Sequence, residues 1–199
     1  MRLGIYGGTF SPPHNGHFLA AKSFAEEMEL DRLLIIPTYI PPHKSMSDDT
    51  TAEQRLQMCA IAFSELEIAE ISDIEIKRRG KSYTYLTLEE LSREGVELYL
   101  LCGTDMFLTL DTWANFERIF NLATVCCARR EEDAENGALI ESKLQEYKTK
   151  YNARAVILSH KALEISSTDV RRCINSGENS VQLIDGRVLE YIRERGLYK

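Results

Sequence analysis

The sequence has few of the features that mark membrane, secreted or nucleic-acid-binding proteins. No run of about 18 consecutive apolar residues, the length that a membrane-spanning helix needs, occurs in the chain. The start contains glycines and histidines and is unlike a signal peptide, so we expect a cytoplasmic protein. Basic residues are scarce, 24 against 31 acidic ones, and the net charge of −7 disfavours binding to nucleic acid or to an anionic membrane. Any anionic ligand must therefore be held by a local site.

Cysteines are few and have no metal-binding spacing. Five are present, an odd number, none of them in a Cys-x-x-Cys pair, and most lie within apolar runs. This pattern favours reduced, buried thiols over a disulfide framework. Cys126 and Cys127 are adjacent in an apolar run, so they point to opposite faces of a strand and cannot both bind one metal ion from that strand. We expect no structural metal site.

Two common phosphate-binding patterns are also missing. Neither Gly-x-Gly-x-x-Gly nor Gly-x-x-x-x-Gly-Lys-[Ser/Thr] occurs in the chain. The chain has instead the stretch GGTFSPPHNGH at residues 7–17, directly after the apolar residues 3–6. Gly7 and Gly8 are expected to allow positive backbone torsions and a close approach to a ligand. The stretch is typical of a strand that ends in a glycine turn and continues as a helix.

Two histidines lie at the start of that predicted helix. His14 and His17 are spaced i, i+3 and share one face at the amino end, where N–H groups and the helix dipole attract anions. Residues 166–172 form a second predicted helix start, which contains Arg171 and Arg172. Arginines at a helix start oppose the dipole unless an anion is bound there. The two stretches therefore predict phosphate binding.

Apolar runs and helical periodicity alternate along the chain. The predicted strands cover residues 3–6, 33–36, 71–76, 98–102, 123–128 and 155–158. The predicted helices cover 16–28, 82–94, 134–150 and 185–195, with another after 166. One further helix begins with a capping box, Thr51 with Gln54 or Thr50 with Glu53. Two short helices follow Asp105, the second containing residues 113 and 116.

This alternation predicts an α/β fold: a doubly wound, Rossmann-like parallel sheet with helices on both faces and a small helical C-terminal region. We expect one domain over residues 1–199, with residues 165–199 as its helical C-terminal part. Ligands of such sheets bind beyond the carboxyl ends of the strands. If the first strand neighbours the strand at 98–102, the turns at Gly7 and Gly103 border a single crevice.

Two motifs resemble the signatures of the nucleotidyltransferase superfamily. Residues 14–17, HNGH, match its His-x-Gly-His signature, and residues 165–171, ISSTDVR, match its late Ile-Ser-Ser-Thr-x-x-Arg signature. Further blocks resemble those of the bacterial nicotinate mononucleotide adenylyltransferases, in that family's order and over nearly the whole chain. They are Gly7–Phe10, Pro42–Lys44, Arg79–Gly80, Ser82–Thr84, Gly103–Asp105 and Leu110–Trp113. Ser11 and Leu86 stand where those enzymes commonly carry Asp, and Phe116 stands where a second tryptophan is frequent.

The resemblance implies transfer of the adenylyl group of ATP to nicotinate mononucleotide, which gives deamido-NAD and pyrophosphate in NAD biosynthesis. The attacking phosphate oxygen is already ionised, so the reaction needs positioning and charge neutralisation rather than a general base. The candidate catalytic residues, as donors to the phosphates, are His14, His17, Thr168 and Arg171. Mg²⁺ would be held mainly by the ATP phosphates, with no metal ligands assigned to the protein.

The resemblance also implies where each substrate binds. The candidate ATP-binding residues are Gly7, Gly8, Thr9, Phe10, Gly103, Asp105, Ile165, Ser166 and Ser167. On the acceptor side, backbone N–H groups around Thr84 and Tyr85 would hold the nicotinate carboxylate. Trp113 would stack on the pyridine ring, and Lys44 would meet phosphate.

Simpler roles for some of these residues stay open. Asp105 could serve only as a helix N-cap, and Trp113 could be a core residue. His43 and Lys44 could belong to a solvated polar loop. The basic residues 77–81 fit a solvated, hairpin-like edge.

Alternative functions also stay open. The acceptor could be nicotinamide mononucleotide, alone or together with the acid, and the chain could be a nucleotide-binding module that has lost catalysis. Partners other than the small-molecule substrates are not indicated. The oligomeric state is open, with the aromatic C-terminal end around Tyr191 and Tyr198 as a candidate patch for a homo-oligomer.

Overall fold

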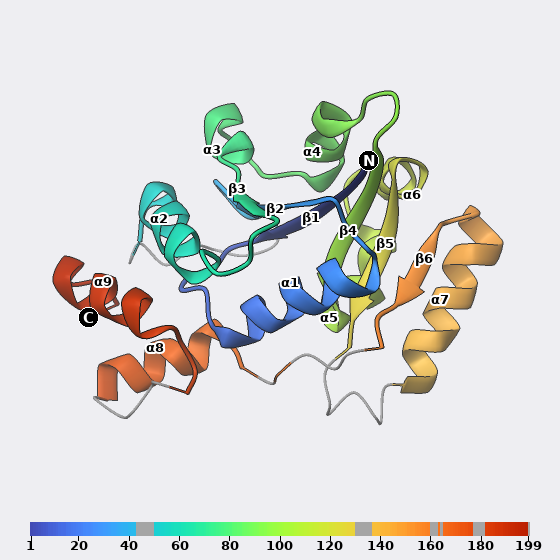
Figure 1. Cartoon of the computed structure of the whole chain (residues 1–199). Coiled ribbons are helices and arrows are strands. Elements are labelled where there is room, and N and C mark those ends of the chain that lie inside the picture. Colours follow the sequence, from blue (N-terminus) through green and yellow to red (C-terminus); the bar gives the residue numbers. More distant parts are fainter. Residues whose placement is uncertain (43–49, 130–136, 160–162, 164, 177–181, 199) are drawn as a thin grey trace.

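A single parallel sheet forms the centre of the molecule. The computed structural model describes residues 1–42, 50–129, 137–159, 163, 165–176 and 182–198. Within these residues the strands are β1 (Arg2–Gly8), β2 (Arg32–Pro37), β3 (Ala69–Ile71), β4 (Glu97–Gly103), β5 (Ala123–Ala128) and β6 (Ala155–Ile157). All neighbouring strands pair in parallel, in the order β3-β2-β1-β4-β5-β6 (Figure 1). The predicted doubly wound α/β fold is confirmed, and β1 and β4 are neighbours at the point where the order reverses.

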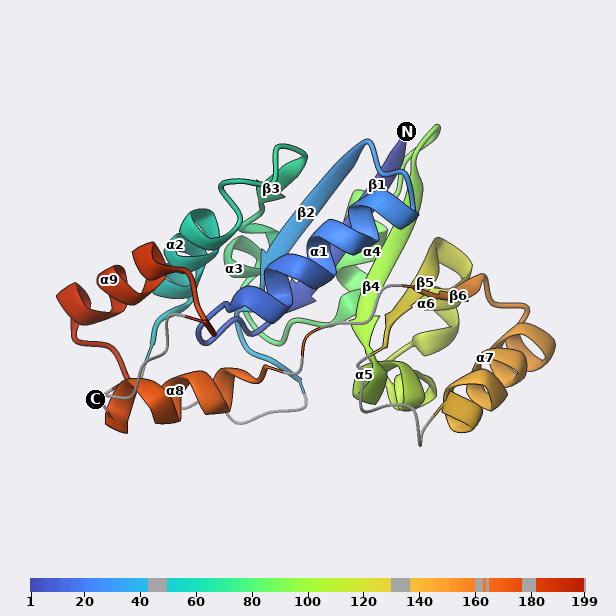
Figure 2. The ribbon, with the colours of Figure 1, turned by 60° about the horizontal axis from the view of Figure 1, so that its bottom comes forward.

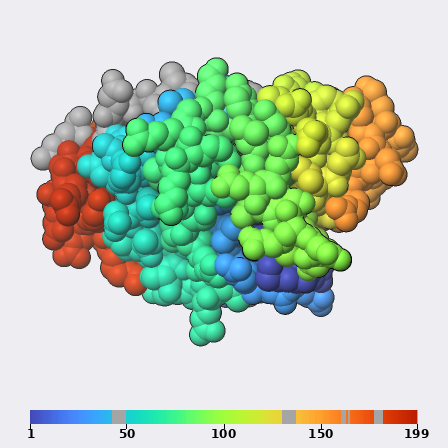
Figure 3. Space-filling view, turned by 90° about the horizontal axis from the view of Figure 1, so that it is seen from above, coloured from blue at the N-terminus to red at the C-terminus, as the bar shows by residue number. Residues whose placement is uncertain are grey.

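Helices cover both faces of this sheet. They are α1 (Asn15–Glu27), α2 (Ala52–Ala62), α3 (Ile74–Arg78), α4 (Thr84–Leu91), α5 (Thr104–Leu108), the 3-10 helix η1 (Leu110–Thr112), α6 (Phe116–Leu122), α7 (Gly137–Tyr151), α8 (Ser167–Ser176) and α9 (Gly186–Arg195). Figure 2 shows α1 crossing one face, with α8 and α9 beside it and α7 at the opposite edge of the sheet. In Figure 3, α3 and α4 (green) cover the middle of the other face.

The strands are apolar on both sides, and successive side chains enter different cores. In β2, Leu33 and Ile35 pack with α1, α2, α8 and α9, whereas Leu34 and Ile36 pack with α4, α5, α6 and α7. Cys126 and Cys127 likewise point to opposite faces, as their adjacency predicts. All five cysteines are buried, and burial raises the pKa of the Cys126 thiol to about 12.

The C-terminal region packs on the same core as α1 and α2. Val170 of α8 and Val188 and Ile192 of α9 are buried there. Helix α9 begins after Asp185, whose carboxylate accepts from the Arg187 N–H, and ends at Gly196 in the left-handed conformation. This region is helical as predicted. Its assignment to a single domain with the rest of the chain stays a prediction.

The prediction of a strand at residues 71–76 is wrong. Strand β3 ends at Ile71, and Ser72 makes the last hydrogen bond to β2 through the Ile35 carbonyl. The chain then turns into α3, which buries Glu75. Short alternating stretches are ambiguous between strand and helix, and here tertiary packing of the polar Glu75 decides for helix. Lys77 and Arg78 are consequently helical and do not belong to a hairpin edge.

The predicted glycine turn lies later than expected. Gly7 and Gly8 are both strand residues, paired with Ile36 and Pro37 of β2, and neither has a positive φ. The turn falls at Thr9 and Phe10, where Phe10 itself adopts a φ of 49°. Gly8 is nevertheless required, because a Cβ atom there would lie 2.9 Å from the buried Phe10 ring.

Two further expectations need correction. Trp113 does not lie on a helix with Phe116, because it follows η1 and precedes α6. Tyr198 is only 3% exposed, so it cannot form a surface patch for a second copy of the chain. Burial of the terminal tyrosine could not be inferred from local sequence. None of the helices in the described ranges is long and apolar enough to cross a membrane.

Candidate active site

One crevice lies at the carboxyl ends of β1 and β4. Its volume is about 640 Å³, within the usual range for small-molecule sites. The crevice is lined from both halves of the sheet and from the start of α8. Every candidate site residue lines it except Tyr85, a residue of α4 whose side chain packs against the core, and Lys44, which lies outside the described residues. The turns at Gly7 and Gly103 thus border one cavity.

His14 and His17 form a capping box at the start of α1. His14 is the N-cap, and its Nδ1 accepts from the His17 N–H at 3.3 Å. In return, His17 Nδ1 accepts from the His14 N–H at 3.2 Å, and the two rings stack with centroids 3.6 Å apart. Two side chains that are not typical caps therefore satisfy backbone donors of the first turn.

This pairing also sets which nitrogen of each neutral ring carries the proton. A neutral imidazole that accepts at Nδ1 carries its proton at Nε2. Each histidine therefore presents an Nε2–H donor on the side opposite its capping bond. His14 is 6% exposed and His17 is half-buried, and both line the crevice. The geometry suits donation to a ligand oxygen rather than removal of a proton.

Gly16 lies where two chain segments approach each other closely. A Cβ atom at this position would lie 3.1 Å from His14 Nδ1 and 3.2 Å from the Leu163 carbonyl oxygen. Any larger residue would push on the capping histidine or on the segment that leads into α8. The glycine of the His-x-Gly-His motif thus allows the two motifs to meet.

Helix α8 begins directly beside this turn. Ser167 Oγ donates to the Pro12 carbonyl at 3.0 Å, and Arg171 Nη1 donates to the Ser11 carbonyl at 2.6 Å. Arg171 Nη2 lies 3.1 Å from Thr168 Oγ1. The motifs at residues 14–17 and 165–171 are far apart in sequence, and these bonds bring the two helix starts to one turn. Together they create a site with several donors for an anion.

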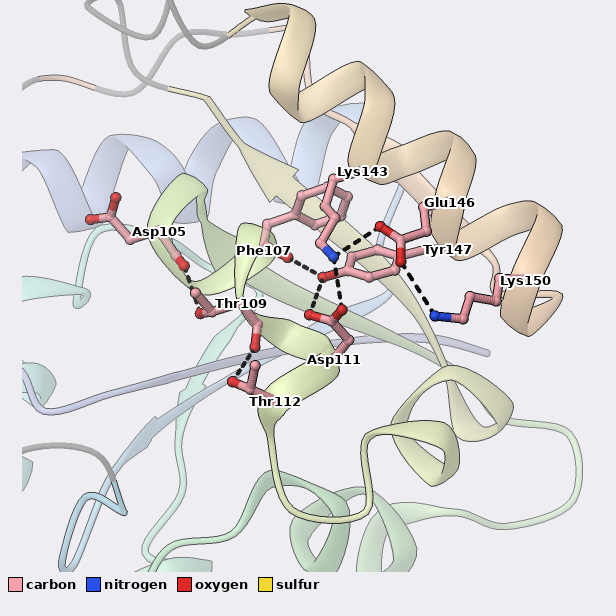
Figure 4. A network of polar contacts seen from close by, with 9 residues as sticks. All are labelled: Asp105, Phe107, Thr109, Asp111, Thr112, Lys143, Glu146, Tyr147 and Lys150. Atoms are coloured by element: carbon pink, nitrogen blue, oxygen red, sulfur yellow. Dashed lines mark hydrogen bonds and ion pairs between the residues drawn. The ribbon is translucent and has the colours of Figure 1, made fainter.

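The end of β4 supplies the opposite wall. Gly103 is the N-cap of α5, so Asp105 lies in the first turn and is not an N-cap itself. Figure 4 shows the Asp105 carboxylate pointing away from the polar network that joins α5 and η1 to α7. In that network Tyr147 donates to the Phe107 carbonyl at 2.8 Å, and Lys143 lies 2.7 Å from Asp111. Helix α7 therefore fixes the segment that carries Asp105 and Trp113.

Comparison with known proteins identifies the family. A family model described as cytidylyltransferase-like matches residues 5–173. A probable nicotinate-nucleotide adenylyltransferase of Desulfatibacillum aliphaticivorans is 35% identical over 215 aligned residues, covering 100% of both chains. One of Clostridium botulinum (strain Eklund 17B / Type B) is 36% identical over 199 residues, covering 100% of this chain and 98% of the relative. The chain belongs to the nicotinate-nucleotide adenylyltransferase family.

Solved structures of this adenylyltransferase family share the fold. The Plasmodium falciparum nicotinic acid mononucleotide adenylyltransferase complexed with NaAD superimposes with a TM-score of 0.80 at 17% identity, covering 99% of this chain and 97% of that one. A putative nicotinate-nucleotide adenylyltransferase of Vibrio parahaemolyticus gives a TM-score of 0.66 at 20% identity, covering 99% of this chain and 94% of that one. These likenesses support the doubly wound architecture.

Two buried charged residues of this family member escaped the sequence interpretation. Glu75, which is 5% exposed, lines the crevice, as does Thr84. Its Oε1 accepts from Thr87, whereas Oε2 has no hydrogen-bond partner within the described residues, and burial raises its pKa. Arg55 is fully buried in α2. The available signal for Arg55 was its place on the apolar face of that helix, three and four residues from Ala52 and Cys59.

Proposed function

We propose that the chain transfers the adenylyl group of ATP to nicotinate mononucleotide, producing deamido-NAD and pyrophosphate. One observation carries the proposal: the starts of α1 and α8 meet at the Ser11–Pro12 turn and line one crevice with His14, His17 and Arg171. Full-length similarity to relatives named for this activity supports the choice of reaction. The fold places the crevice at the switch point, where doubly wound sheets bind nucleotides.

Charge stabilisation is the chemistry that these residues supply. A phosphate oxygen of the mononucleotide attacks the α-phosphorus of ATP, the bond to the bridging oxygen breaks, and pyrophosphate leaves with that electron pair. The Nε2–H groups of His14 and His17 donate to the phosphate oxygens while charge develops on them. Arg171 and the Thr168 hydroxyl hold the β- and γ-phosphates, which keeps the leaving group in line. The nucleophile is already ionised, so no residue of the chain is assigned as a base.

The nucleoside and the acceptor bind on opposite walls. The backbone from Gly7 to Phe10, together with Gly103 and residues 165–167, encloses the adenosine, and Asp105 accepts from the ribose hydroxyls. On the other wall are the backbone N–H groups of Thr84 and Tyr85, in the first turn of α4. The hydrogen bonds within this helix begin with the next N–H group, that of Leu86, which donates to the Tyr83 carbonyl. The position of the Thr84 and Tyr85 N–H groups suits an anionic carboxylate. The half-buried Trp113 stacks on the pyridine ring.

A divalent cation, Mg²⁺ in our proposal, accompanies the nucleotide. Within the described residues no three His, Cys, Asp or Glu side chains are grouped to hold a metal ion. This donor set fits an ion carried by the triphosphate, for which few protein ligands are needed. The ion supplies neutralisation of phosphate charge when bound, and the chain's donors orient the remaining oxygens.

A direct assay tests the proposed reaction. Purified protein is given ATP and Mg²⁺ with nicotinate mononucleotide, its amide, phosphopantetheine or flavin mononucleotide, and pyrophosphate release is measured. We expect turnover with nicotinate mononucleotide that is well above the rate with the amide and is abolished by chelating the metal. Turnover only with phosphopantetheine or the flavin would overturn the acceptor assignment. ATP binding without any pyrophosphate release would identify a binding module instead.

His17→Ala distinguishes catalysis from capping in the same assay. Loss of one donor to the transition state should lower kcat by about 100-fold or more. The matched control is Thr51→Ala, which removes the cap of the equivalent box on α2, where Thr51 Oγ1 accepts from the Gln54 N–H at 3.2 Å. Both variants lose about 1 kcal/mol of stability, but only the histidine variant should lose turnover. Equal kcat values in the two variants would contradict the catalytic role.

A further inference from the structure

The turn at Thr9–Ser11 is held by side chains from three distant parts of the chain. It lies between β1 and the His14 cap, and all three of its residues line the crevice. Phe10 is 2% exposed and Ser11 is 8% exposed, so the turn is packed into the protein. Its polar groups are bonded to Arg55, Arg171 and Tyr198. Arg171 already has a proposed role toward phosphate, whereas the other two have none.

Arg55 contacts the turn from α2. Its Nη1 donates to the Thr9 carbonyl at 2.9 Å, and its Nη2 donates to the Thr38 carbonyl at 2.6 Å. Thr9 follows β1 and Thr38 follows β2, so one guanidinium joins the ends of two strands. It also lies 3.3 Å from the Tyr39 carbonyl. The fork geometry of arginine, with donors on both terminal nitrogens, makes this link possible.

The environment of Arg55 is unusual for a buried cation. The ion pairs of the described residues do not include it, and its Nε has no hydrogen-bond partner among them. Burial lowers the pKa of the guanidinium. Burying a charge without a carboxylate partner opposes folding, and the bonds to the backbone carbonyls offset that cost. A role for Arg55 beyond filling the core follows.

Tyr198 reaches the same turn from the C-terminal end. Its hydroxyl lies 3.0 Å from Ser11 Oγ, across 187 positions of sequence, and Ser11 Oγ is 3.4 Å from Thr50 Oγ1. The tyrosine is 3% exposed. Burial raises its pKa, which keeps the hydroxyl protonated and able to donate at neutral pH. The chain after α9 thus returns its last described residue to the turn.

Ser11 connects these contacts to the phosphate-binding residues. The same serine bonds Tyr198 through its side chain and accepts from Arg171 Nη1 through its carbonyl oxygen. A displacement of Ser11 would therefore displace the guanidinium of Arg171 and, through Pro12, the Ser167 side chain. Neither Arg55 nor Tyr198 lines the crevice. Both can act on a ligand only through the turn.

We propose that Arg55 and Tyr198 are positioning residues for adenylyl transfer, which hold the Thr9–Ser11 turn so that Arg171 and the two histidines face the phosphates. This inference rests on the proposed function. Misplacing transition-state donors lowers kcat more than it weakens ground-state binding. The signature of the role is thus a fall in kcat at a nearly constant KM for ATP.

The Tyr198–Ser11 contact is tested by Tyr198→Phe, Ser11→Ala and the double variant. Loss of one buried hydrogen bond, typically about 1 kcal/mol, should lower kcat about five-fold while KM for ATP stays within about two-fold. The double variant should be no slower than the slower single variant, because both remove the same bond. Tyr191→Phe is the control: it removes a hydroxyl from α9, and Tyr191 does not line the crevice.

Arg55 is tested by Arg55→Lys and Arg55→Met. Lysine keeps the charge but cannot bond both carbonyls in the same geometry, so kcat should fall about ten-fold per folded molecule, and methionine should lower it further. Arg32→Met is the control, because Arg32 makes an equally bidentate contact with Glu70 at the surface, far from any lining residue of β2. If Arg55→Met does not fold, the kcat values of Arg55→Lys and of the Tyr198 variants test the positioning role.

Three results would overturn the inference. Variants that lose thermal stability but keep the wild-type kcat would show a purely structural role. A wild-type protein that releases no pyrophosphate would remove the proposed function, and the inference with it. An active wild type with unaffected Tyr198 and Arg55 variants would refute the positioning role alone.

Discussion

Glu75 has a buried carboxyl group in the wall of the crevice. Thr87 donates to its Oε1 at 2.7 Å, and Arg78 lies 3.8 Å from the same atom. Burial nevertheless dominates and raises its pKa above the usual value for glutamic acid. The folded protein therefore holds this proton at pH values where the unfolded chain has released it. The neutral acid can then donate a hydrogen bond within the crevice as well as accept one.

This proton links Glu75 to stability. Between the usual glutamate pKa and the raised folded value, the native state binds more protons than the unfolded state, so stability falls as pH rises. The contribution is fully present below the unfolded pKa and is lost as pH passes through the folded one. Glu75→Gln should flatten this fall when the free energy of urea unfolding is measured from about pH 4 to about pH 8.

The control for that titration is Glu70→Gln. The hydrogen bond from Arg32 lowers the pKa of Glu70. Ionised Glu70 therefore stabilises the fold above its unfolded pKa, which is the opposite pH dependence to that of Glu75. Its effect should be small because the pair is exposed. A difference between wild type and Glu75→Gln that does not change with pH would contradict a raised pKa at Glu75.

At the scale of single residues, local sequence was enough for some roles and not for others. His14 and His17 lie three positions apart at a helix start, so their shared face was predictable from spacing alone. Arg55 and Glu75 bond to carbonyl and hydroxyl groups that lie far away in sequence. No local pattern records such partners, although the place of Arg55 on the apolar face of α2 was a local signal of its burial.

The connection between β4 and α6 depends on a neighbouring element. Helix α5 and η1 are short; Asp105 lies in α5, and Trp113 directly follows η1. Helix α7 contacts both elements through Lys143 and Tyr147 (Figure 4). Burial opposes ionisation of Asp111, but hydrogen bonds from Lys143 and the charge of that lysine hold its pKa below the usual value. The network holds residues 104–112, which form only the short α5 and η1, in one conformation.

Tyr147→Phe tests this role of α7. The variant keeps the ring, which packs 5.3 Å from Phe107 and 4.9 Å from Phe120, but removes the donor to the buried Phe107 carbonyl. The free energy of unfolding in urea should fall by about 1 to 2 kcal/mol. Tyr151→Phe on the same helix is the control and should change it by less than about 0.5 kcal/mol. Equal effects would place the stabilisation in the rings instead of the hydroxyl bond.

Elements with strong local signals were predicted correctly. The capping box of Thr51 and Gln54 and the left-handed stop at Gly196 are both present. The segment 71–78 was predicted wrongly because its alternation is too short to separate strand from helix. Burial of Glu75 against Thr87 of α4 decides for helix there, and that contact joins two elements.

At the scale of the whole molecule, the crevice joins parts that are distant in sequence. Its lining comes from both halves of the sheet and from the region that precedes α8. A dinucleotide that fills the crevice would contact all of these parts in the folded state and none of them in the unfolded chain. Ligand binding should therefore stabilise the entire fold.

Deamido-NAD at about 100 times its Kd should add about 2.7 kcal/mol of stability. For a chain of this size the expected rise in Tm is roughly 5–10 °C, measured by differential scanning calorimetry. Nicotinate mononucleotide alone should add the same free energy at the same multiple of its own Kd, because the stabilisation depends only on the ratio of ligand concentration to Kd. No shift with either compound would contradict binding in the crevice.

Local chain chemistry was sufficient to predict the alternation of strands and helices, the positions of the helix starts at residues 14–17 and 166–171, and the burial of the thiols. These features depend on residues that are near one another in sequence or on hydropathy. Packing over long distances decided that β1 and β4 are neighbours, that Ser11 meets Arg171 and Tyr198, and that Arg55 joins two strand ends. The physical reason is that each of these contacts satisfies a buried polar group with a partner that only the folded chain brings within reach.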